Sequence, residues 1–525
     1  MSRTRSFPLH PLLMGAFPVL TLLAWNREQA EPAEALRSLI VCLLGAALVW
    51  AIVSLLIWPR ERAAAICTLI LVLFFSYGHV YNFLKGVDIS GFILGRHRYL
   101  APVWLLLLIT GISLQLSGAR DYRNLTSFLN LVSVTAVAIA VVQLGAFELR
   151  RLSAEREMQA SALGTAEGTG LQAAGAGTAR DVYYIILDGY GRQDALLDLI
   201  GYDNSEFVDW LQENGFYVAA CGQSNYAQTE LSLASSLNFS YLETLDDSFQ
   251  PGNTDRSRLR PLILQSATRR LLEEQGYTTV AFETGFYWTQ IKDADVYLFP
   301  RLGALQGSGI ASGMNGFETL LFRTTAGSIV ADSAAVLPSK LVPDLDSPIR
   351  KHRDRVLFTL DSLERVPSLP GPKFVFAHVV SPHEPFVFGP DGEWVDPQQV
   401  PEAERDEEWY ATSYGNQVTF LNSEMERILG TILAESSPAP IIILQADHGP
   451  SRGNHRMDIF NAYYLPEGGD QALYPTITPV NSFRLMFNRY FGGTYSLLPD
   501  QSYFSIYDTP FKYRFVPNDA PGCAP

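Results

Sequence analysis

Long apolar stretches fill the first third of the chain, and near residue 180 they give way to short apolar runs separated by amphipathic segments. Five of the long stretches have the length and composition of membrane-spanning helices. They cover roughly 9–25, 38–58, 64–84, 100–117 and 127–147. The first follows two arginines, as a signal peptide would, but no small-residue cleavage pattern comes after it, so we expect it to be retained. Residues 1–151 are therefore predicted to form a five-helix transmembrane domain.

The next two segments differ from each other in pattern. Residues 152–179 are rich in Ala, Gly and Thr with little apolar periodicity, which predicts a flexible linker. Residues 180–525 alternate strand-like runs, such as VYYIILD and PIIILQAD, with helix-like segments. Because these runs are apolar throughout, the strands are expected to be buried on both faces. The sequence thus predicts an α/β domain, an α/β/α sandwich with a mostly parallel sheet.

Charge is divided unevenly between the two parts. Residues 1–151 carry 13 Lys+Arg and 7 Asp+Glu, whereas the remainder carries 26 and 47. An acidic globular half argues against a nucleic-acid partner. Lys and Arg are nearly balanced between the two sides of the predicted bundle, and the densely basic PRER turn favours a cytoplasmic N-terminus. Five spans would then make this a multi-pass inner-membrane protein with its globular domain outside the cytoplasm.

Four cysteines in 525 residues do not make a disulfide framework. Cys42 and Cys67 lie in apolar segments and are expected to fill buried space. Only Cys221 and Cys523 fall in the globular part, and the sequence leaves open whether they pair.

Polar residues follow the strongest predicted strands. Asp188 ends VYYIILD, the pair Asp447 and His448 follows PIIILQ, and His378 and His383 lie at or after KFVFAHVV. In open α/β sheets, ligands gather at the carboxyl ends of the strands, so these side chains are expected to meet. An Asp after a strand is often only a turn former, but the ordered set is more specific. Carboxylates with imidazoles favour Zn²⁺ or Mn²⁺, with Mg²⁺ as the alternative.

Thr229 begins the helix-like segment TELSLASSLN. A threonine there can be a simple helix cap. However, a hydroxyl at a helix N-terminus is also well placed to bind a phosphate or sulfate group, and a metal on the same oxygen would make it a nucleophile. Ser224 is the competing nucleophile. These ingredients indicate phosphoryl or sulfuryl ester chemistry.

The residues resemble the sulfatase-like branch of the alkaline phosphatase superfamily, notably membrane-anchored phosphoglycerol and phosphoethanolamine transferases of the lipoteichoic acid synthase type. The resemblance covers roughly 180–515 and rests on the order of an acid after the first strand, a threonine before a helix, Pro-His-x-Pro and Asp-His-Gly. It implies that Asp188, Thr229, Asp447 and His448 bind the metal, with Thr229 also the nucleophile.

The resemblance implies roles for three further histidines. His383 would contact the transferred group or protonate the leaving oxygen. His455, in SRGNHRMDIF, sits where some relatives carry another histidine. His378 either supports the site or fills the end of its strand. Gln417 lies in a helix that resembles a family segment, although a solvated helix face explains it equally well.

One departure from the family matters for the cofactor. Formylglycine sulfatases need a Cys or Ser in a Cys-x-Pro-x-Arg type motif, and CGQSN lacks both the Pro and the Arg. The expected cofactor is therefore one divalent metal ion, with a weaker second ion as an option, and no formylglycine.

The resulting functional expectation is a membrane-anchored, metal-dependent sulfatase-like hydrolase or transferase. It would act on phosphate-type esters, rather than sulfate esters, of a membrane lipid or an envelope glycan through a covalent threonine intermediate. The alternatives are a hydrolase that uses water as acceptor, and a non-catalytic sulfatase-like envelope assembly protein.

Overall fold

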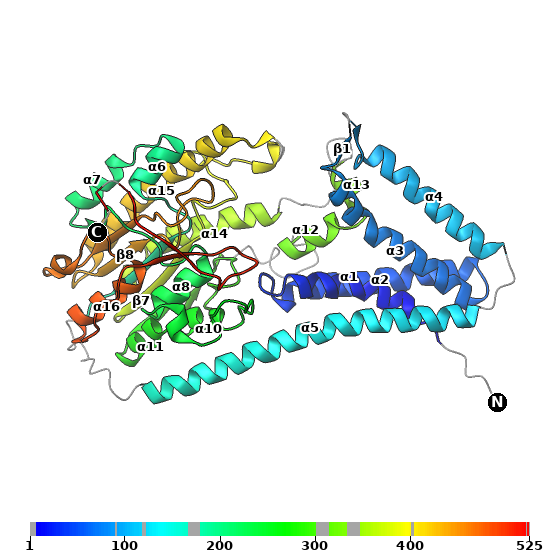
Figure 1. Ribbon diagram of the computed structural model, residues 1–525, viewed down its shortest axis with the longest axis horizontal. Coiled ribbons are helices and arrows are strands. Elements are labelled where there is room, and N and C mark those ends of the chain that lie inside the picture. Colours follow the sequence, from blue (N-terminus) through cyan, green and yellow to red (C-terminus); the bar gives the residue numbers. More distant parts are fainter. Residues whose placement is uncertain are drawn as a thin grey trace. The chain divides into compact units, whose positions relative to one another are not determined.

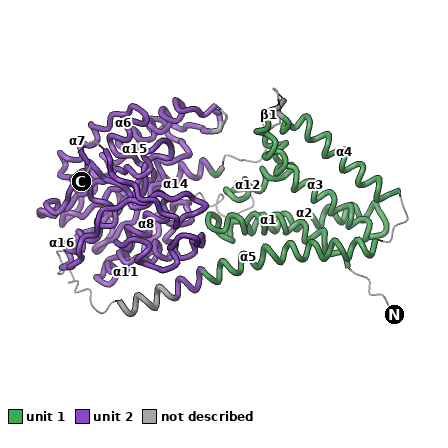
Figure 2. The backbone as a smooth tube through the Cα atoms, viewed as in Figure 1, with its two compact units in different colours: residues 1–150, 302–348 green, residues 151–301, 349–525 purple. Residues whose placement is uncertain are grey.

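The computed structural model describes residues 7–89, 92–117, 122–165, 179–300, 314–332, 347–400, 404–520 and 522–523. The chain forms two compact units, which Figure 2 shows in different colours. Unit 1 comprises Met1–Arg150 and Leu302–Pro348, and unit 2 comprises Arg151–Arg301 and Ile349–Pro525. The predicted boundary near residue 180 was therefore too simple, because an internal segment of the expected globular domain belongs to the membrane unit.

Unit 1 consists mainly of apolar helices. Its elements are α1 (His10–Trp25), α2 (Pro32–Leu56), α3 (Arg60–Leu84), β1 (Asp88–Ile89), β2 (Phe92–Ile93), α4 (His97–Leu116), α12 (Gly316–Arg323), α13 (Gly327–Asp332) and the first part of α5 (Tyr122–Thr165), which continues into unit 2. Among the described residues, α2, α3, α4 and α5 are long and apolar enough to cross a membrane, whereas α1 is a shorter apolar helix of 16 residues. Each of the five helices α1 to α5 overlaps one of the five predicted spans.

Helix α5 extends beyond its predicted span as far as Thr165. The first part of the predicted flexible linker is therefore helical, and residues 166–178 lie outside the described residues. The physical reason is local. The sequence LSAEREMQASAL consists mostly of good helix formers, and the glycines begin only at Gly164. An ion pair between Arg151 and Glu155, one helical turn apart at 2.5 Å, adds to the helix.

Helices α12 and α13 lie in the segment that unit 1 takes from the later part of the chain. Phe317 and Leu321 on α12 share a buried apolar cluster with residues of α1 and α2. Glu318 forms an ion pair with Arg37 of α2. The backbone N–H of Ala326 donates to the carbonyl of Phe74 on α3 at 2.8 Å. Apolar packing and a paired charge thus explain why this segment folds with the membrane helices.

Unit 2 contains a seven-stranded sheet in the order β4-β9-β8-β3-β7-β5-β6. The strands are β3 (Val182–Leu187), β4 (Tyr217–Val218), β5 (Thr278–Phe282), β6 (Val296–Leu298), β7 (Lys373–Val379), β8 (Ile441–Gln445) and β9 (Asn461–Tyr464). Strands β8, β3, β7, β5 and β6 pair in parallel, whereas β9 is antiparallel to both of its neighbours. A separate hairpin joins β10 (Ser502–Phe504) to β11 (Arg514–Val516). The mostly parallel sheet is confirmed.

Helices cover both faces of this sheet (Figure 1). One face packs against α8 (Thr229–Leu237), α10 (Leu259–Leu264), α11 (Ala267–Glu274) and α16 (Pro479–Tyr490), with the short α9 (Leu242–Leu245) beside them. The other packs against α6 (Gln193–Ile200), α7 (Ser205–Glu213), α14 (Ser347–Leu363) and α15 (Glu407–Glu435). Alternate residues of β3 enter the two apolar clusters, as expected for a strand buried on both sides. The predicted sandwich is confirmed.

Cys221 and Cys523 form a disulfide across a sequence separation of 302 residues. The sequence had left this pairing open. The bond ties the C-terminal end of the chain to the strand-to-helix connection that precedes α8.

Candidate metal centre

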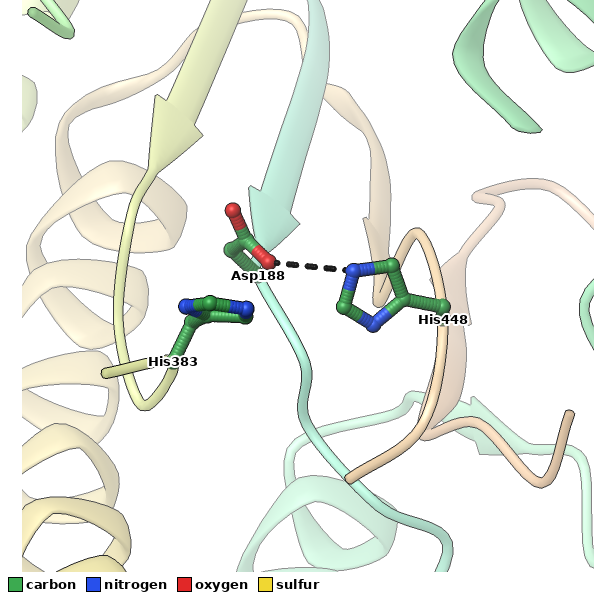
Figure 3. A group of neighbouring side chains, drawn as sticks. All are labelled: Asp188, His383 and His448. Atoms are coloured by element: carbon green, nitrogen blue, oxygen red, sulfur yellow. Dashed lines mark ion pairs between the residues drawn. The ribbon is translucent and has the colours of Figure 1, made fainter. Parts of the chain in front are cut away.

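Three adjacent strands of unit 2 carry the candidate site at their carboxyl ends. Strand β3 lies between β7 and β8. Asp188 follows β3, His378 lies near the end of β7 and His383 follows it, and Asp447 and His448 follow β8. Figure 3 shows Asp188 between His383 and His448, with the two imidazoles brought in by separate loops. Parallel pairing thus delivers polar side chains to one edge of the sheet.

Two overlapping groups of side chains have the spacing of metal ligands. One is Asp188, His383 and His448, and the other is Asp188, His378 and Asp447. In each group, one ligand atom per residue lies within 4.8 Å of the others. Both groups share Asp188, so its carboxylate is the centre of the arrangement.

Several of these ligand atoms are buried without a hydrogen-bond partner. They are Oδ1 of Asp188, Oδ2 of Asp447 and Nε2 of His378. Burying a polar atom without a partner costs roughly 1–3 kcal/mol, and more for a charged one. Three such atoms at one place are the arrangement expected of a site that binds a cation.

The distances around Nε2 of His448 also fit a metal. This nitrogen lies 3.5 Å from Oδ1 of Asp188 and 3.4 Å from Oδ2 of Asp447. It lies 3.3 Å from Oγ1 of Thr229. Tetrahedral ligands at about 2.1 Å from a zinc ion stand about 3.4 Å apart. The residues therefore fit a metal of this class.

The imidazole of His448 is in the form that binds a metal. Its Nδ1 lies 2.9 Å from the carbonyl oxygen of Gly449, which can only accept a hydrogen bond. The proton therefore sits on Nδ1 and leaves the lone pair of Nε2 pointing at the carboxylates. Burial, together with the positive charge of Arg456, lowers the pKa of His448 to about 4, so the ring is neutral at physiological pH.

The two carboxylates are held in place by the chain around them. Burial alone would raise the pKa of Asp188, but His383, His378 and His448 together hold it below its usual value. Oδ1 of Asp447 accepts a hydrogen bond from the N–H of Gly189 at 3.1 Å. Gly189 has φ 74°, and a Cβ there would lie 3.5 Å from the ring of His383. That distance is an ordinary van der Waals contact, so glycine is needed here for the turn, which its positive φ permits.

Thr229 is the first residue of α8, and its hydroxyl contacts His448 instead of capping the helix. The cap position is Gln228, whose side chain makes no capping hydrogen bond. Ser224 has a structural role, because its hydroxyl is buried between the carbonyl oxygens of Tyr226 and Asp447, each at 2.6 Å. Of the two candidate nucleophiles, only Thr229 faces the ligand atoms.

His383 stands at the open side of the site. Its backbone N–H donates to the carbonyl of Asp188 at 2.9 Å, and its ring centroid lies 5.8 Å from that of His448. Gln417 of α15 is buried and holds this loop, accepting from the N–H of Val387 at 2.8 Å and donating to the carbonyl of Pro382 at 3.0 Å. The solvated-face explanation of Gln417 is therefore wrong.

The other two predicted histidines have different surroundings. His378 is buried, with Nδ1 2.9 Å from the hydroxyl of Thr289 and Nε2 3.3 Å from Oδ2 of Asp188. It therefore belongs to the ligand group. His455 lies outside that group, because its two ring nitrogens contact Asp458 and Asp198 at 2.8 Å each.

Two residues that the sequence did not single out also lie near the site. Arg456 is close enough to Asp447 and Asp188 to interact electrostatically with both. His352 on α14 interacts with Asp188 and His383, and its Nε2 is buried without a hydrogen-bond partner. Burial lowers the pKa of His352 to about 4. Neither residue follows a strand, so neither carries the signal that marked the others.

Residues 180–483 match the family model described as Sulfatase. No curated protein matches the chain. Solved structures similar to it include the C-terminal periplasmic domain of EcEptC from Escherichia coli, with 13% identity, coverage of 63% of this chain and 90% of that one, and a TM-score of 0.39. Another is phosphoethanolamine transferase EptA from Neisseria meningitidis, with 11% identity and a TM-score of 0.34. The match covers 88% of this chain and 89% of EptA. A third is phosphonate monoester hydrolase of Agrobacterium radiobacter, with 13% identity and a TM-score of 0.35. The match covers 62% of this chain and 80% of the hydrolase.

Proposed function

Since the chain belongs to the sulfatase family, which its match over more than half its length shows, we propose that it is a membrane-anchored, metal-dependent hydrolase or transferase. Its substrates are phosphate-type esters of a membrane lipid or an envelope glycan, and its reaction passes through a covalent intermediate on Thr229. One observation carries this proposal. The hydroxyl of Thr229 lies 3.3 Å from Nε2 of His448, beside buried carboxylate oxygens that lack partners.

Asp188, Asp447, His448 and Thr229 would hold the metal, which we expect to be Zn²⁺ or Mn²⁺, with Mg²⁺ as the alternative. When bound, the ion supplies positive charge that lowers the pKa of the threonine hydroxyl and offsets the charge of the transferred group. His378, together with Asp188 and Asp447, is the residue from which a second, weaker site would be built, and His383 is left for proton transfer. The two overlapping ligand groups around Asp188 support that arrangement.

The proposed reaction has two displacements. In the first, Oγ1 of Thr229 gives its proton to solvent water and bonds to phosphorus, while the bond from phosphorus to the leaving oxygen breaks. The imidazole of His383 gives that oxygen a proton. In the second, an acceptor hydroxyl or water loses its proton to His383 and bonds to phosphorus, the bond from phosphorus to Oγ1 of Thr229 breaks, and Oγ1 regains a proton from solvent water. A sugar hydroxyl as acceptor gives transfer, and water gives hydrolysis.

The proposed membrane topology has five spans, a cytoplasmic N-terminus and unit 2 outside the cytoplasm. Glu318, Arg323 and Thr324, in and directly after α12, contact the ends of α2 and α3 at Arg37 and Gly78. In this topology the ends of α2 and α3 that carry Arg37 and Gly78 lie on the outer side of the membrane. The disulfide in unit 2 also suits an oxidising compartment.

Formylglycine chemistry is not part of the proposal. Cys221 is the cysteine of the CGQSN segment, and its sulfur is bonded to Cys523. The hydroxyl of Ser224 in the same segment is buried, and its oxygen lies 2.6 Å from each of two carbonyl oxygens. Thr229 is therefore the nucleophile that the surroundings favour.

The test is turnover of a lipid phosphodiester and of a model phosphodiester by the full-length protein, compared with Thr229→Ala and Thr229→Ser. Removal of the nucleophile should lower kcat by at least about 10³-fold, since the covalent route is lost. Thr229→Ser should retain part of the activity, and zinc and manganese content should remain measurable in all three proteins. Equal turnover by wild type and Thr229→Ala would refute the assignment. A wild type without bound metal would favour a scaffold.

A further inference from the structure

Arg456 lies on a loop that is fixed between the elements carrying the ligands and the nucleophile. The N–H of Gly449, next to His448, donates to the carbonyl of Arg456 at 2.8 Å. The N–H of Ser224, five residues before Thr229, donates to the carbonyl of Met457 at 2.7 Å. A Cβ at Gly449 would overlap the carbonyl of His455, so the loop packs tightly there. The position of Arg456 is therefore determined by backbone contacts on both sides.

The guanidinium of Arg456 spans the two sides of the site. Its Nε donates to the carbonyl of Ala227 at 2.8 Å, two residues before Thr229. Its Nη1 lies 3.5 Å from the carbonyl of Gly449, which follows His448. Among the described residues, Nη2 donates no hydrogen bond. The charged group thus has two neutral acceptors and a remaining donor near the nucleophile.

The charges around Arg456 indicate what that donor would bind. Asp188 and Asp447 interact with it electrostatically, but a divalent cation held between them would offset both negative charges. Glu230, the third acid nearby, pairs with Arg256 at 3.3 Å. Arg456 then remains as one uncompensated positive charge, which suits an anionic phosphoryl group.

We propose that Arg456 binds a non-bridging oxygen of the transferred phosphoryl group and stabilises the charge that builds on it during attack by Thr229. This inference deepens the proposed function and rests on it. The group it recognises is a phosphate monoester, a phosphodiester or inorganic phosphate, because all three present the same anionic oxygens.

The first measurement is the binding of inorganic phosphate to the full-length, metal-loaded protein by calorimetry. Arg456→Met should raise the Kd for phosphate at least about 10-fold, in line with the loss of one charged hydrogen bond. Arg456→Lys keeps the charge without the planar fork, so a smaller rise is expected. Arg452→Met is the matched control. Arg452 lies on the same loop but contacts Glu407 and the ring of Tyr410, and its loss should leave the Kd unchanged.

The second measurement is kcat/KM for a model phosphodiester, which should fall about 10²-fold in Arg456→Met, with the loss mainly in kcat. Metal content should match wild type, and Tm should fall slightly, because the hydrogen bond from Nε to the carbonyl of Ala227 is lost. An unchanged phosphate Kd in Arg456→Met would overturn the inference, as would metal loss in proportion to activity or an equal effect of Arg452→Met. If wild type binds phosphate but turns over no phosphodiester, the proposed function fails while the binding result still decides the role of Arg456. If Arg456→Met does not fold, Arg456→Lys decides by the same criteria.

Discussion

Asp188 is the residue on which the site converges, since it belongs to both ligand groups and contacts His378 and His448. Its carboxylate lies in the same buried group as that of Asp447, so without a cation the two negative charges repel each other. His378, His383 and His448 outweigh this repulsion at Asp188, because they hold its pKa below the usual value. A bound metal is expected to stabilise the site further.

Asp188→Asn removes one of those charges while nearly preserving shape. The metal-free Tm should fall at neutral pH, because Asp188 loses the contacts with His378, His383 and His448 that hold its pKa below the usual value. Zn²⁺ at about 100 times the wild-type Kd should stabilise the wild type by about 2.7 kcal/mol and so raise its Tm. Asp188→Asn should lose this gain. Thermal unfolding with and without Zn²⁺ measures both effects. The exposed Asp391→Asn is the control, and a zinc-dependent Tm gain in Asp188→Asn would contradict the ligand role.

His455 gives a prediction that depends on pH. Burial alone would lower its pKa, but Asp198 and Asp458 raise it above the usual value. The resulting stability is present below about pH 6.5, the pKa in the unfolded chain, and is lost as pH rises through the raised value. His455→Gln should therefore lower the free energy of unfolding, and with it Tm, more at pH 6 than at pH 8.5. The difference in free energy should be less than about 1 kcal/mol, because Asp198 is largely exposed.

The same variant separates a structural role from a role in binding substrate. If His455 only stabilises its loop, kcat/KM at pH 8.5 should stay within a few-fold of wild type. A large loss of kcat/KM, together with a Tm equal to that of wild type at both pH values, would show that the ion pairs do not stabilise the fold and that His455 acts on substrate.

The residues that sequence could identify share a local signal. Asp188, Asp447 and His448 follow apolar strands, and Thr229 begins a helix, so each position could be predicted from its own segment. The role of Arg456 depends on a loop that folds back onto the segment before α8. The sequence contains no motif or spacing that predicts this contact.

At the scale of elements, the segment that carries α12 and α13 is the main departure from expectation. Its sequence contains turn formers and helix-like stretches that suit either unit, and the choice depends on partners more than 200 residues earlier. The tertiary contacts with α1, α2 and α3 decide it. The sandwich itself was predictable because buried parallel strands leave a continuous apolar pattern.

Gly78 tests the docking of this segment. A Cβ at Gly78 would overlap the backbone of Thr324, so Gly78→Ala should weaken docking by about 1–3 kcal/mol. We expect residues 302–348 to be cleaved about 10-fold faster by protease in the full-length protein. Gly145→Ala on α5 is the matched control, because nothing lies within 4 Å of its Cβ position. Equal cleavage rates in both variants would contradict the docking.

A charge exchange examines the same contact independently. Glu318 is nearly buried beside Arg37, so Glu318→Arg or Arg37→Glu alone should also speed cleavage. The double exchange restores opposite charges and should return the rate towards wild type. A double variant as sensitive as the sum of the single variants would show that the ion pair does not hold the segment.

At the scale of the whole molecule, the disulfide joins the segment before α8 to the C-terminal end of the chain. Replacing both Cys221 and Cys523 with Ser should lower the stability of unit 2 by about 2–5 kcal/mol, because the unfolded chain gains freedom. Thermal unfolding of the full-length protein in detergent measures the loss. Cys42→Ser, which removes a free cysteine of α2, is the control. No difference in Tm from wild type would mean that the bond is absent from the protein as expressed.

The account depends most on the convergence of Asp188, Asp447, His448 and Thr229 on one cation. An anomalous-scattering map from crystals of the full-length protein grown with Zn²⁺ or Mn²⁺ tests it directly. We predict a single strong peak about 2.0–2.3 Å from a carboxylate oxygen of each aspartate, Nε2 of His448 and Oγ1 of Thr229. A peak bound elsewhere, or one at the aspartates with Oγ1 of Thr229 turned away, would contradict the account.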